Sequence, residues 1–429
     1  MVSLVLGGSL FGMALAGATL GAAMGLTGLI ILKFFAGGAT DLGILAVWNQ
    51  TNNFTFSAVP MFLLLGDLMV ASGLSGRIYG AVAPLFERIP GGLLHSNIAV
   101  STLFGAVSGS SAATSAAVGS VAYPELEARG YFPASVAASL AAGGTLGLLI
   151  PPSLSLLIFG AWQDVSIGRL FLAGVLPGLM MAALFMLYIF LDSFRRPNLH
   201  PAPAPYMKFV KALRGIAELW PLLVLMGSVL GTIYLGLATP TEAAGLGVLA
   251  TIILGFTVGE LTVKRVMDAA TSSIASFGAI AFILTGAAIL SQAVTLIGLS
   301  GKIVQFTHAL SLSKYELLVA VMLFYLVMGI FFDGISLMLT TVPFIYPVMV
   351  AAGFHPVWIG VFVTIMVEIG MLTPPVGVNL FIMLAITRGK VSLGAISREC
   401  LPYWVMLLVG TLLMTAFPQI ALFLPQLVY

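Results

Sequence analysis

The residues that could do chemistry in this chain are oxygen-bearing side chains placed in apolar surroundings. The stretch "SGSS" at 108–111 supplies three hydroxyls, and "DGIS" at 333–336 supplies a carboxylate and one more hydroxyl. Hydroxyls, backbone carbonyls and a single carboxylate form an all-oxygen ligand set, which suits a hard cation. Because acidic residues are scarce, the pattern favours a monovalent ion, Na⁺, over Ca²⁺.

The same polar stretches could bind an organic anion. A helix that begins at such a stretch offers free N–H groups and the positive end of its dipole, which suit a carboxylate substrate. The alternative is purely structural, since small residues allow tight helix packing with hydroxyls bonded to the backbone one turn away. The candidate substrate-binding residues are Ser110, Ser111, Thr114, Ser153, Ser336 and Asn379.

The composition is that of a protein dissolved in lipid. Hydrophobic residues make up 60% of the 429 residues and charged residues only 7%, whereas a soluble domain carries roughly a quarter charged residues. Apolar runs of about 20 residues, the span of a bilayer core, recur along the chain, for example Phe171–Leu191. We therefore predict an all-α polytopic membrane protein, with a lipid bilayer and no nucleic acid among its partners. The single cysteine, Cys400, excludes a disulfide framework.

An internal repeat divides the chain into two halves. The pair Pro151-Pro152 lies 223 residues before a second proline pair, Pro374-Pro375. The same offset carries "YPELEARGYFP" (Tyr123–Pro133) onto "YPVMVAAGFHP" (Tyr346–Pro356). Apolar matches alone would be chance, but prolines and glycines in a fixed order are strong evidence of duplication.

The proline pairs predict two broken helices. A proline inside a helix removes a backbone hydrogen bond, and each unsatisfied polar group in hydrocarbon costs several kcal/mol. Repeats with Gly/Pro interruptions at corresponding positions are the sequence mark of secondary transporters. We therefore interpret the two breaks as binding sites rather than as packed kinks.

A polar segment precedes each proline pair. Phe104–Ser120 and Met328–Phe344 are both rich in small or polar residues, and the offset of 223 residues places Ser110 over Asp333. We interpret each segment as a re-entrant hairpin: a helix in, a polar tip and a helix out. Each repeat is thus predicted to contain one hairpin and one broken helix.

The longest polar stretch, Arg195–Arg214, carries five basic residues, four prolines and no acid. By the positive-inside rule it lies in the cytoplasm, between the two repeats. The predicted segments are N-terminal scaffold helices at 1–90; the first hairpin, broken helix and a following arm or scaffold helix at 91–194; the linker at 195–215; second-half scaffold helices at 216–315; and the second hairpin, broken helix and C-terminal helix at 316–429.

Charged residues inside a membrane are functional candidates by default because they are costly. Asp333, at a hairpin tip, is the strongest. Glu368, six residues before the second proline pair, could face a polar cavity or a helix end. Asp67 is interpreted as a packing or interfacial residue, and Glu242 as one that favours a helix N-terminus. The histidines have no metal-ligand spacing, and His355 is interpreted as structural or solvated.

Three glycines at intervals of four, Gly17, Gly21 and Gly25, predict a flat ridge for close helix contact. This ridge could face either the same chain or a separate subunit.

These segments together resemble the large membrane subunit of tripartite ATP-independent periplasmic (TRAP) transporters, in its unfused form. The resemblance runs in order through "SGSSAATSAAVGS", "IPPSLSLLIFG", "ATPTEAAGLGVL", "FFDGISLMLTTVPFIYPV" and "EIGMLTPPVGVNLF". It implies an elevator-type fold in which a scaffold surrounds a transport domain built from two inverted repeats. It also implies a small four-helix membrane subunit, a periplasmic substrate-binding protein, and uptake of organic acids across the bacterial inner membrane, driven by a Na⁺ gradient.

The resemblance further implies where Na⁺ binds, because family sites form where each hairpin meets the broken helix of its own repeat. In the first repeat the implied residues are Ser108, Ser110, Gly147 and Pro151. In the second repeat they are Asp333, Gly334, Ser336, Gly370, Thr373 and Pro374.

Other functions fit the residues less well. A proton-coupled carrier would need a titrating acid, for which Asp333 and Glu368 are the candidates. An intramembrane protease would need two aspartates, a Ser–His pair or a metal motif, and no H-E-x-x-H occurs. A passive channel would not need duplicated hairpins, and a structural scaffold would not need two polar breaks. We therefore expect a transporter and not an enzyme.

Overall fold

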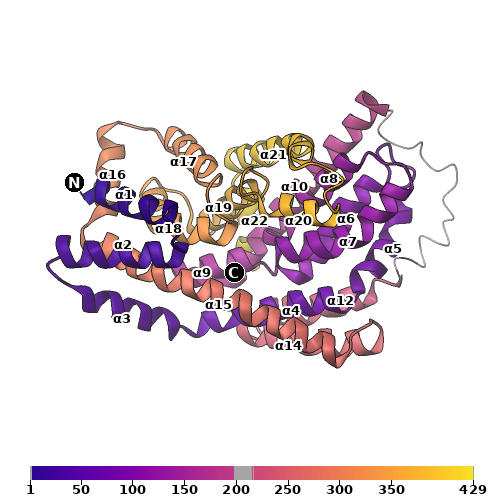
Figure 1. The fold of residues 1–429 in the computed structure, drawn as a ribbon, viewed down its shortest axis with the longest axis horizontal. Helices are drawn as coiled ribbons and strands as arrows, with labels where there is room; N and C mark the ends of the chain where they lie inside the picture. The colour runs from indigo at the N-terminus through magenta and orange to yellow at the C-terminus, as the bar shows by residue number, and fades with distance from the viewer. Residues whose placement is uncertain (1, 198–214, 216, 429) are drawn as a thin grey trace.

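The computed structural model describes residues 2–197, 215 and 217–428, and this part of the chain is helical and contains no strand (Figure 1). The prediction of an all-α protein is confirmed. Most of the predicted linker at 195–215 lies outside the described residues, so the structure does not test it. The division of the chain into scaffold and transport segments stays a prediction.

The first repeat contains twelve described helical segments. They are α1 (Val2–Leu15), α2 (Leu20–Phe35), α3 (Thr40–Thr51), the short η1 (Phe54–Ser57), α4 (Ala58–Ala71), α5 (Leu74–Phe86), α6 (Leu93–Ser108), α7 (Ser111–Ala128), α8 (Pro133–Thr145), η2 (Leu146–Leu148), α9 (Leu154–Gln163) and α10 (Ile167–Arg195).

The second repeat follows the residues that are not described. Its described segments are α12 (Trp220–Met226), the π-helical turn η4 (Gly227–Gly231), α13 (Thr232–Tyr234), α14 (Pro240–Thr257), α15 (Val263–Leu296), α16 (Leu299–Ala309), α17 (Lys314–Met328), α18 (Gly334–Ala351), α19 (Pro356–Met371), α20 (Val378–Ile386), α21 (Leu393–Ala416) and α22 (Gln419–Val428).

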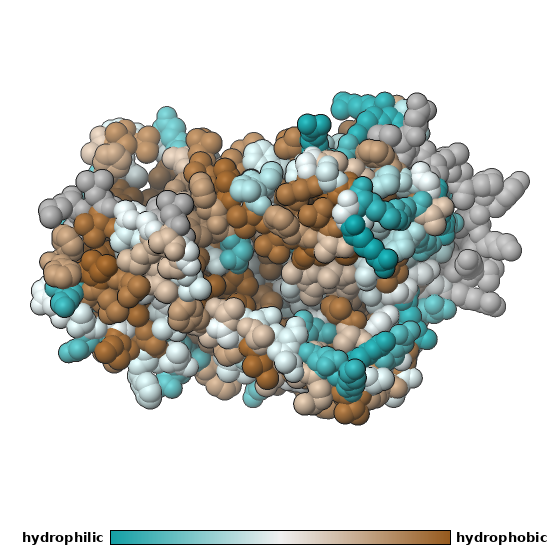
Figure 2. Space-filling model, in the orientation of Figure 1, coloured by the Kyte–Doolittle hydropathy of each residue, from teal (hydrophilic) through white to brown (hydrophobic). Residues whose placement is uncertain are grey.

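Six of the described helices are long and apolar enough to cross a membrane: α4 with η1, α10, α14, α15, α18 and α21. Their surfaces carry large apolar side chains that water would not solvate well, such as Leu179, Leu249 and Phe282, each at least half exposed. Figure 2 shows hydrophobic residues across much of the visible face. This surface fits lipid contact.

A long side of the molecule is formed by α3, α4, α14 and α15, and the helices of the two proline-containing segments pack on its other side (Figure 1). The predicted glycine ridge contacts a helix of this same chain, α15. A Cβ added at Gly21 would lie 2.7 Å from the carbonyl oxygen of Phe282 on α15, and Gly25 and Gly28 contact the same helix. Gly17 is not part of the ridge, because it has a φ of +84° in the turn before α2.

Each predicted hairpin segment folds as two consecutive helices joined by a short turn, α6–α7 and α17–α18, and the members of each pair are in contact. Their arms extend beyond the sequence segments 104–120 and 328–344, because the apolar residues on either side of the polar tips are helical too. Each arm has 15 to 18 residues rather than a single short turn.

The hairpins enter the helical body from opposite ends. At one end, the Ser135 hydroxyl near the start of α8 donates to Glu399 near the start of α21 (2.8 Å), and Glu399 accepts from Arg196, just after α10 (2.7 Å). At the far end of α21, the indole of Trp358 on α19 donates to the carbonyl of Met414 (3.2 Å). Since α8 directly follows α7 and α19 directly follows α18, the two hairpins lead into helices that start near opposite ends of α21. The inverted arrangement of the repeats stays a prediction.

Candidate functional site

We call the α6–α7 hairpin with the break between η2 and α9 the first hairpin–break region. Its tip is set by Gly109, whose φ of +64° ends α6, and by Ser110, whose side chain caps α7. The hydroxyls of Ser108 and Thr114 lie 2.8 Å apart, and Thr114 donates to the carbonyl of Ser110 (2.7 Å). These oxygens therefore gather at one point.

The break of the first repeat lies directly against this tip. The N–H of Leu154, the first residue of α9, donates to the carbonyl of Gly109 (3.1 Å). A Cβ added at Gly147 would lie 2.7 Å from the Thr114 hydroxyl oxygen and 3.0 Å from the carbonyl oxygen of Ser110. Gly147 is thus placed where only a glycine lets the break approach the tip.

Two further predicted residues belong to this break. Ser153 caps α9 by accepting from the N–H of Leu156 (3.2 Å), and its hydroxyl also donates to the carbonyl of Leu148. Pro151 lies in the buried turn between η2 and α9, and the Pro151-Pro152 peptide is cis. The implied first-repeat set of Ser108, Ser110, Gly147 and the Pro151 turn is therefore brought together.

The second hairpin–break region consists of the α17–α18 hairpin and the break between α19 and α20. Asp333 caps α18, with its carboxylate accepting from the N–H of Ser336 (3.4 Å). A Cβ added at Gly334 would lie 2.8 Å from a methyl carbon of Val367 on α19, so the tip contacts the broken helix. Asp333 is exposed, whereas Ser110 at the tip of the first hairpin is half-buried.

The residues at the second break are less closely joined to their hairpin. The Thr373 hydroxyl donates to the carbonyl of Ile369 (2.7 Å) and accepts from the indole of Trp404 (3.1 Å), both outside the hairpin. Pro374 is exposed, and the Pro374-Pro375 peptide is cis like its counterpart. Within the described residues, no hydrogen bond to Asp333 is seen from Thr373.

Gly370 closes a contact that has an equivalent in the first repeat. A Cβ on Gly329, at the end of α17, would lie 2.9 Å from the Cα of Gly370. In the first repeat, a Cβ on Gly105 would lie 2.7 Å from the Cα of Gly147. The sequence analysis missed Gly105 and Gly329. The repeat held the signal, because the two glycines occupy nearly equivalent positions before the two tips.

The structure places Ser111 and Asn379 against each other. The amide of Asn379 on α20 donates to the Ser111 hydroxyl (2.8 Å) and to the carbonyl of Ala141 (2.9 Å). Both side chains are buried. Their hydrogen bonds join the broken helix of one repeat to the hairpin of the other. Ser336 is also buried, and its carbonyl accepts from Thr340 (2.7 Å).

A cavity of about 880 Å³ lies between the first hairpin and the helices α4, α5 and α15. Asp67 on α4 lies in its wall and accepts from the Ser273 hydroxyl on α15 (2.8 Å), a contact between helices that fits the packing or interfacial role expected of it. The cavity reaches Ser110 at the hairpin tip. Its other polar lining residues are Ser75, Ser120, Glu260, Arg265, Asp268, Ser272 and Ser276.

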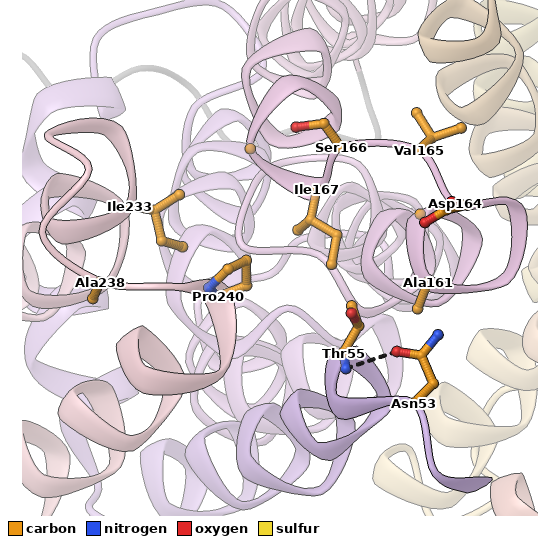
Figure 3. A pocket seen from close by; sticks show the side chains of 12 residues that line it. Asn53, Thr55, Ala161, Asp164, Val165, Ser166, Ile167, Ile233, Ala238 and Pro240 are labelled. Atoms are coloured by element: carbon orange, nitrogen blue, oxygen red, sulfur yellow. Dashed lines mark hydrogen bonds between the residues drawn. The ribbon is translucent and has the colours of Figure 1, made fainter. Parts of the chain in front are cut away.

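A second cavity of about 500 Å³ lies among η1, the α9–α10 turn and the start of α14 (Figure 3). Asn53 and Thr55 line it on one side, with the Asn53 side chain accepting from the Thr55 N–H (2.9 Å), and Asp164 and Ser166 line it across from them. Nearby, Glu242 forms a capping box with Thr239 at the start of α14, which agrees with its predicted helix-terminal role.

The description of the matching family model is "Tripartite ATP-independent periplasmic transporter, DctM component", and it covers residues 8–420. This chain belongs to the TRAP transporter large-component family. The resemblance expected from the sequence is confirmed.

Several curated TRAP permeases are similar along nearly their whole length. The chain is 32% identical to the C4-dicarboxylate large permease DctM of Pseudomonas aeruginosa, covering 94% of this chain and 93% of that one. It is 31% identical to the sialic acid permease SiaM of Vibrio cholerae, with 88% and 87% covered. It is 33% identical to the ectoine/5-hydroxyectoine permease UehC of Ruegeria pomeroyi, with 87% and 86% covered.

Solved membrane transporters share the fold of this TRAP component. The Alcanivorax borkumensis YdaH transporter matches with a TM-score of 0.63 at 17% identity, covering 90% of each chain. Neisseria gonorrhoeae MtrF matches with a TM-score of 0.62 at 15% identity, covering 91% of this chain and 85% of that one. At these identities the likeness concerns the fold alone.

Proposed function

We propose that this TRAP component is the membrane carrier of a Na⁺-coupled system that imports organic acids across the bacterial inner membrane. The observation that carries the proposal is the meeting of hairpin tip and broken helix in the first hairpin–break region. There the hydroxyls of Ser108 and Thr114, the Ser110 carbonyl and the backbone of Gly147 lie within contact of one another. An uncharged all-oxygen set suits a monovalent hard cation such as Na⁺.

The organic acid binds beside the ion, at the tip of the first hairpin. The start of α7 at Ser110 lines the 880 Å³ cavity, so a solute carboxylate there meets a helix N-terminus. The relatives' names support an acid as substrate, since they mention C4-dicarboxylates, isethionate and sialic acid. Ion and acid share one tip, and each therefore favours the binding of the other.

Transport follows an elevator mechanism in this proposal. The hairpins and broken helices move as one body against α4 and α15, which form the opposite wall of the cavity. At Gly66 on α4 the absence of a side chain lets the hairpin tip pass close to α4. A Cβ added there would lie 2.9 Å from the carbonyl oxygen of Ser108. A side chain there would hold the tip away from the scaffold.

The proposed partners are a small four-helix membrane subunit and a periplasmic substrate-binding protein, as the family name "tripartite" suggests. One relative, the isethionate permease DctMQ of Oleidesulfovibrio alaskensis, is a longer chain of which this one covers 63%.

Uptake into proteoliposomes containing this chain and both partners tests the function. We expect labelled organic acid to accumulate when Na⁺ is high outside, and accumulation to stop when K⁺ replaces Na⁺. Unchanged uptake in K⁺ would reject Na⁺ coupling. Uptake driven by a pH gradient and abolished by Asp333→Asn would point instead to the proton-coupled alternative.

A further inference from the structure

Glu368 is a carboxylate in the interior of α19 that the proposed hairpin sites do not use. Its exposure is 0%, and neither of its oxygens has a hydrogen-bond partner among the residues that the structure describes. An ionised carboxylate buried without a partner is costly, and more so within a membrane. A neutral carboxyl group would leave its O–H donor unsatisfied instead. Either form therefore carries a free-energy cost that a bound partner would reduce.

The surroundings of Glu368 are polar on one side. Thr364 lies one turn earlier, so the two side chains share a face of α19. The Thr364 hydroxyl lies 3.0 Å from the hydroxyl of Ser155, and both side chains are buried. Ser155 is in the first turn of α9, so this face of α19 meets the broken helix of the other repeat.

Part of this face also lies against the second hairpin, because the Ser155 hydroxyl donates to the sulfur of Met338 on α18 (3.7 Å). Gly370 and Val367 are the α19 residues nearest to Gly329 and Gly334 of that hairpin. Both are turned away from Glu368 by roughly 100° or more at the 3.6-residue period. Met371, whose sulfur would lie 3.2 Å from a Cβ on Gly334, is turned only about 60° from Glu368. Glu368 therefore lies beside the second hairpin–break region, but it is not one of the residues implied to bind Na⁺ there.

The available chemistry is that of a monovalent cation site. One carboxylate and two hydroxyls offer only oxygen ligands and a single negative charge, which suit Na⁺. The positive charge has to come from outside the two helices, because α9 and α19 contain no Lys, Arg or His.

We propose that Glu368, Thr364 and Ser155 form a Na⁺ site between the two broken helices, separate from the two hairpin sites. An ion held there would join α9 of the first repeat to α19 of the second. The two helix breaks would then become ordered at the same time. Ion binding at one hairpin site could in this way change the Na⁺ affinity of the other. The proposal takes Na⁺ as cargo from the proposed function, but its residues and its position are different.

Binding of ²²Na⁺ to the purified full chain in detergent micelles tests this site by scintillation proximity. We expect Glu368→Gln, which keeps the shape of the side chain, to lower saturating ²²Na⁺ binding by one ion per chain. Thr364→Val should raise the half-saturating Na⁺ concentration. Asp41→Asn, at an exposed acid in the first turn of α3, is the matched control and should change neither quantity.

An unchanged ion count in Glu368→Gln, with the variant folded as judged by gel filtration, would overturn the proposal. If the pH dependence of binding is lost at the same time, the carboxyl group carries a proton instead of a Na⁺ ion. If Glu368→Gln does not fold, an unchanged half-saturating concentration in both Thr364→Val and Ser155→Ala contradicts the site.

The same binding assay distinguishes a failure of this inference from a failure of the proposed function. Ser108→Ala and Asp333→Asn test the hairpin sites in the same assay. If these variants leave ²²Na⁺ binding unchanged while Glu368→Gln lowers it, the hairpin sites fail and the site at Glu368 remains. The reverse result rejects the inference and leaves the hairpin sites standing.

Discussion

The two hairpin–break regions share one sequence skeleton but differ in how tightly they close. In the first, the backbone N–H of Leu154 is bonded to the tip carbonyl of Gly109, and the proline turn is buried. In the second, Asp333 and Pro374 are exposed, and the break bonds to itself through Gly377 N–H and the Thr373 carbonyl (2.9 Å). The repeated prolines thus determine where a helix breaks, while the residues of the hairpin tip determine whether the break is buried and hydrogen-bonded to the tip.

The difference begins at one position. Gly109 can adopt a φ of +64°, which turns the tip carbonyl towards α9. The repeat offset places Phe332 at the corresponding position in the second hairpin, and its side chain is buried in the core. A bulky L-residue rarely adopts positive φ, so the second tip does not form the same turn.

The largest expected effect comes from Gly109→Ala. The left-handed conformation alone costs roughly 1–2 kcal/mol for a non-glycine residue, and the new Cβ would lie 2.5 Å from the carbonyl oxygen of Pro152. We expect loss of uptake in proteoliposomes and a clearly lower Tm in detergent.

Gly130→Ala is the matched control for this substitution. Gly130 also has positive φ, at +81°, but a Cβ there would meet no atom within 4 Å. It should show only the conformational cost and keep uptake. If both variants behave alike, the contact between the first tip and its break contributes nothing, and the contrast between the two regions disappears.

A smaller effect on uptake is expected from Asp333→Asn in the second hairpin–break region. Asparagine caps a helix about as well as aspartate, so α18 should persist while the charge is lost. Loss of a charged ligand should raise the half-saturating Na⁺ concentration about tenfold, or ~1.4 kcal/mol. Sodium titration of uptake measures the shift. Asp333→Ala, which removes the cap as well, should add a drop in Tm; an unshifted titration in Asp333→Asn would exclude this carboxylate from ion binding.

The hydrogen bonds between Ser111 and Asn379 link the two regions. Asn379→Ala would leave the Ser111 hydroxyl and the Ala141 carbonyl buried without their partner, which costs roughly 1–3 kcal/mol. We expect a lower Tm for this variant and a smaller loss for Ser111→Ala. The double variant should show a coupling energy of about 1 kcal/mol. Additive losses would mean that the regions are not joined through this pair.

Much of the skeleton could be predicted from the sequence, because the constraints are local. Proline pairs break helices wherever they occur, and the constant offset located both hairpins and both breaks. The tip residues Ser110 and Asp333 were also predictable, since a Ser or Asp before an apolar run caps a helix. These are properties of a few neighbouring residues.

The closure of the breaks could not be predicted, because it depends on contacts between distant segments. Nothing near Asn379 in the sequence indicates that its amide is occupied by Ser111, 268 residues away. The complete burial of Glu368 is likewise not indicated by its neighbours in the sequence. The exposure of Pro374 beside the burial of Pro151 is likewise decided by packing, since the two sequences look equivalent.

The smallest expected effect on stability concerns the N-termini of α8 and α19, where one repeat has a titratable residue and the other does not. His355 caps α19 by accepting from the N–H of Val357 (3.2 Å), and Phe132 stands at the equivalent start of α8 without a side-chain cap. Partial burial lowers the pKa of His355, and the positive charge of Arg169 lowers it further.

A lowered pKa means that folding favours the neutral imidazole. The stabilisation is therefore fully present above the unfolded-state pKa of about 6.5 and is lost as the pH falls through the lower folded-state value. We expect the Tm of the wild-type chain to fall slightly more between pH 7 and pH 5 than that of His355→Asn, which keeps a cap that does not titrate. Because the side chain is exposed, the difference should be small. Identical pH profiles would show that the second entrance, like the first, is insensitive to protonation.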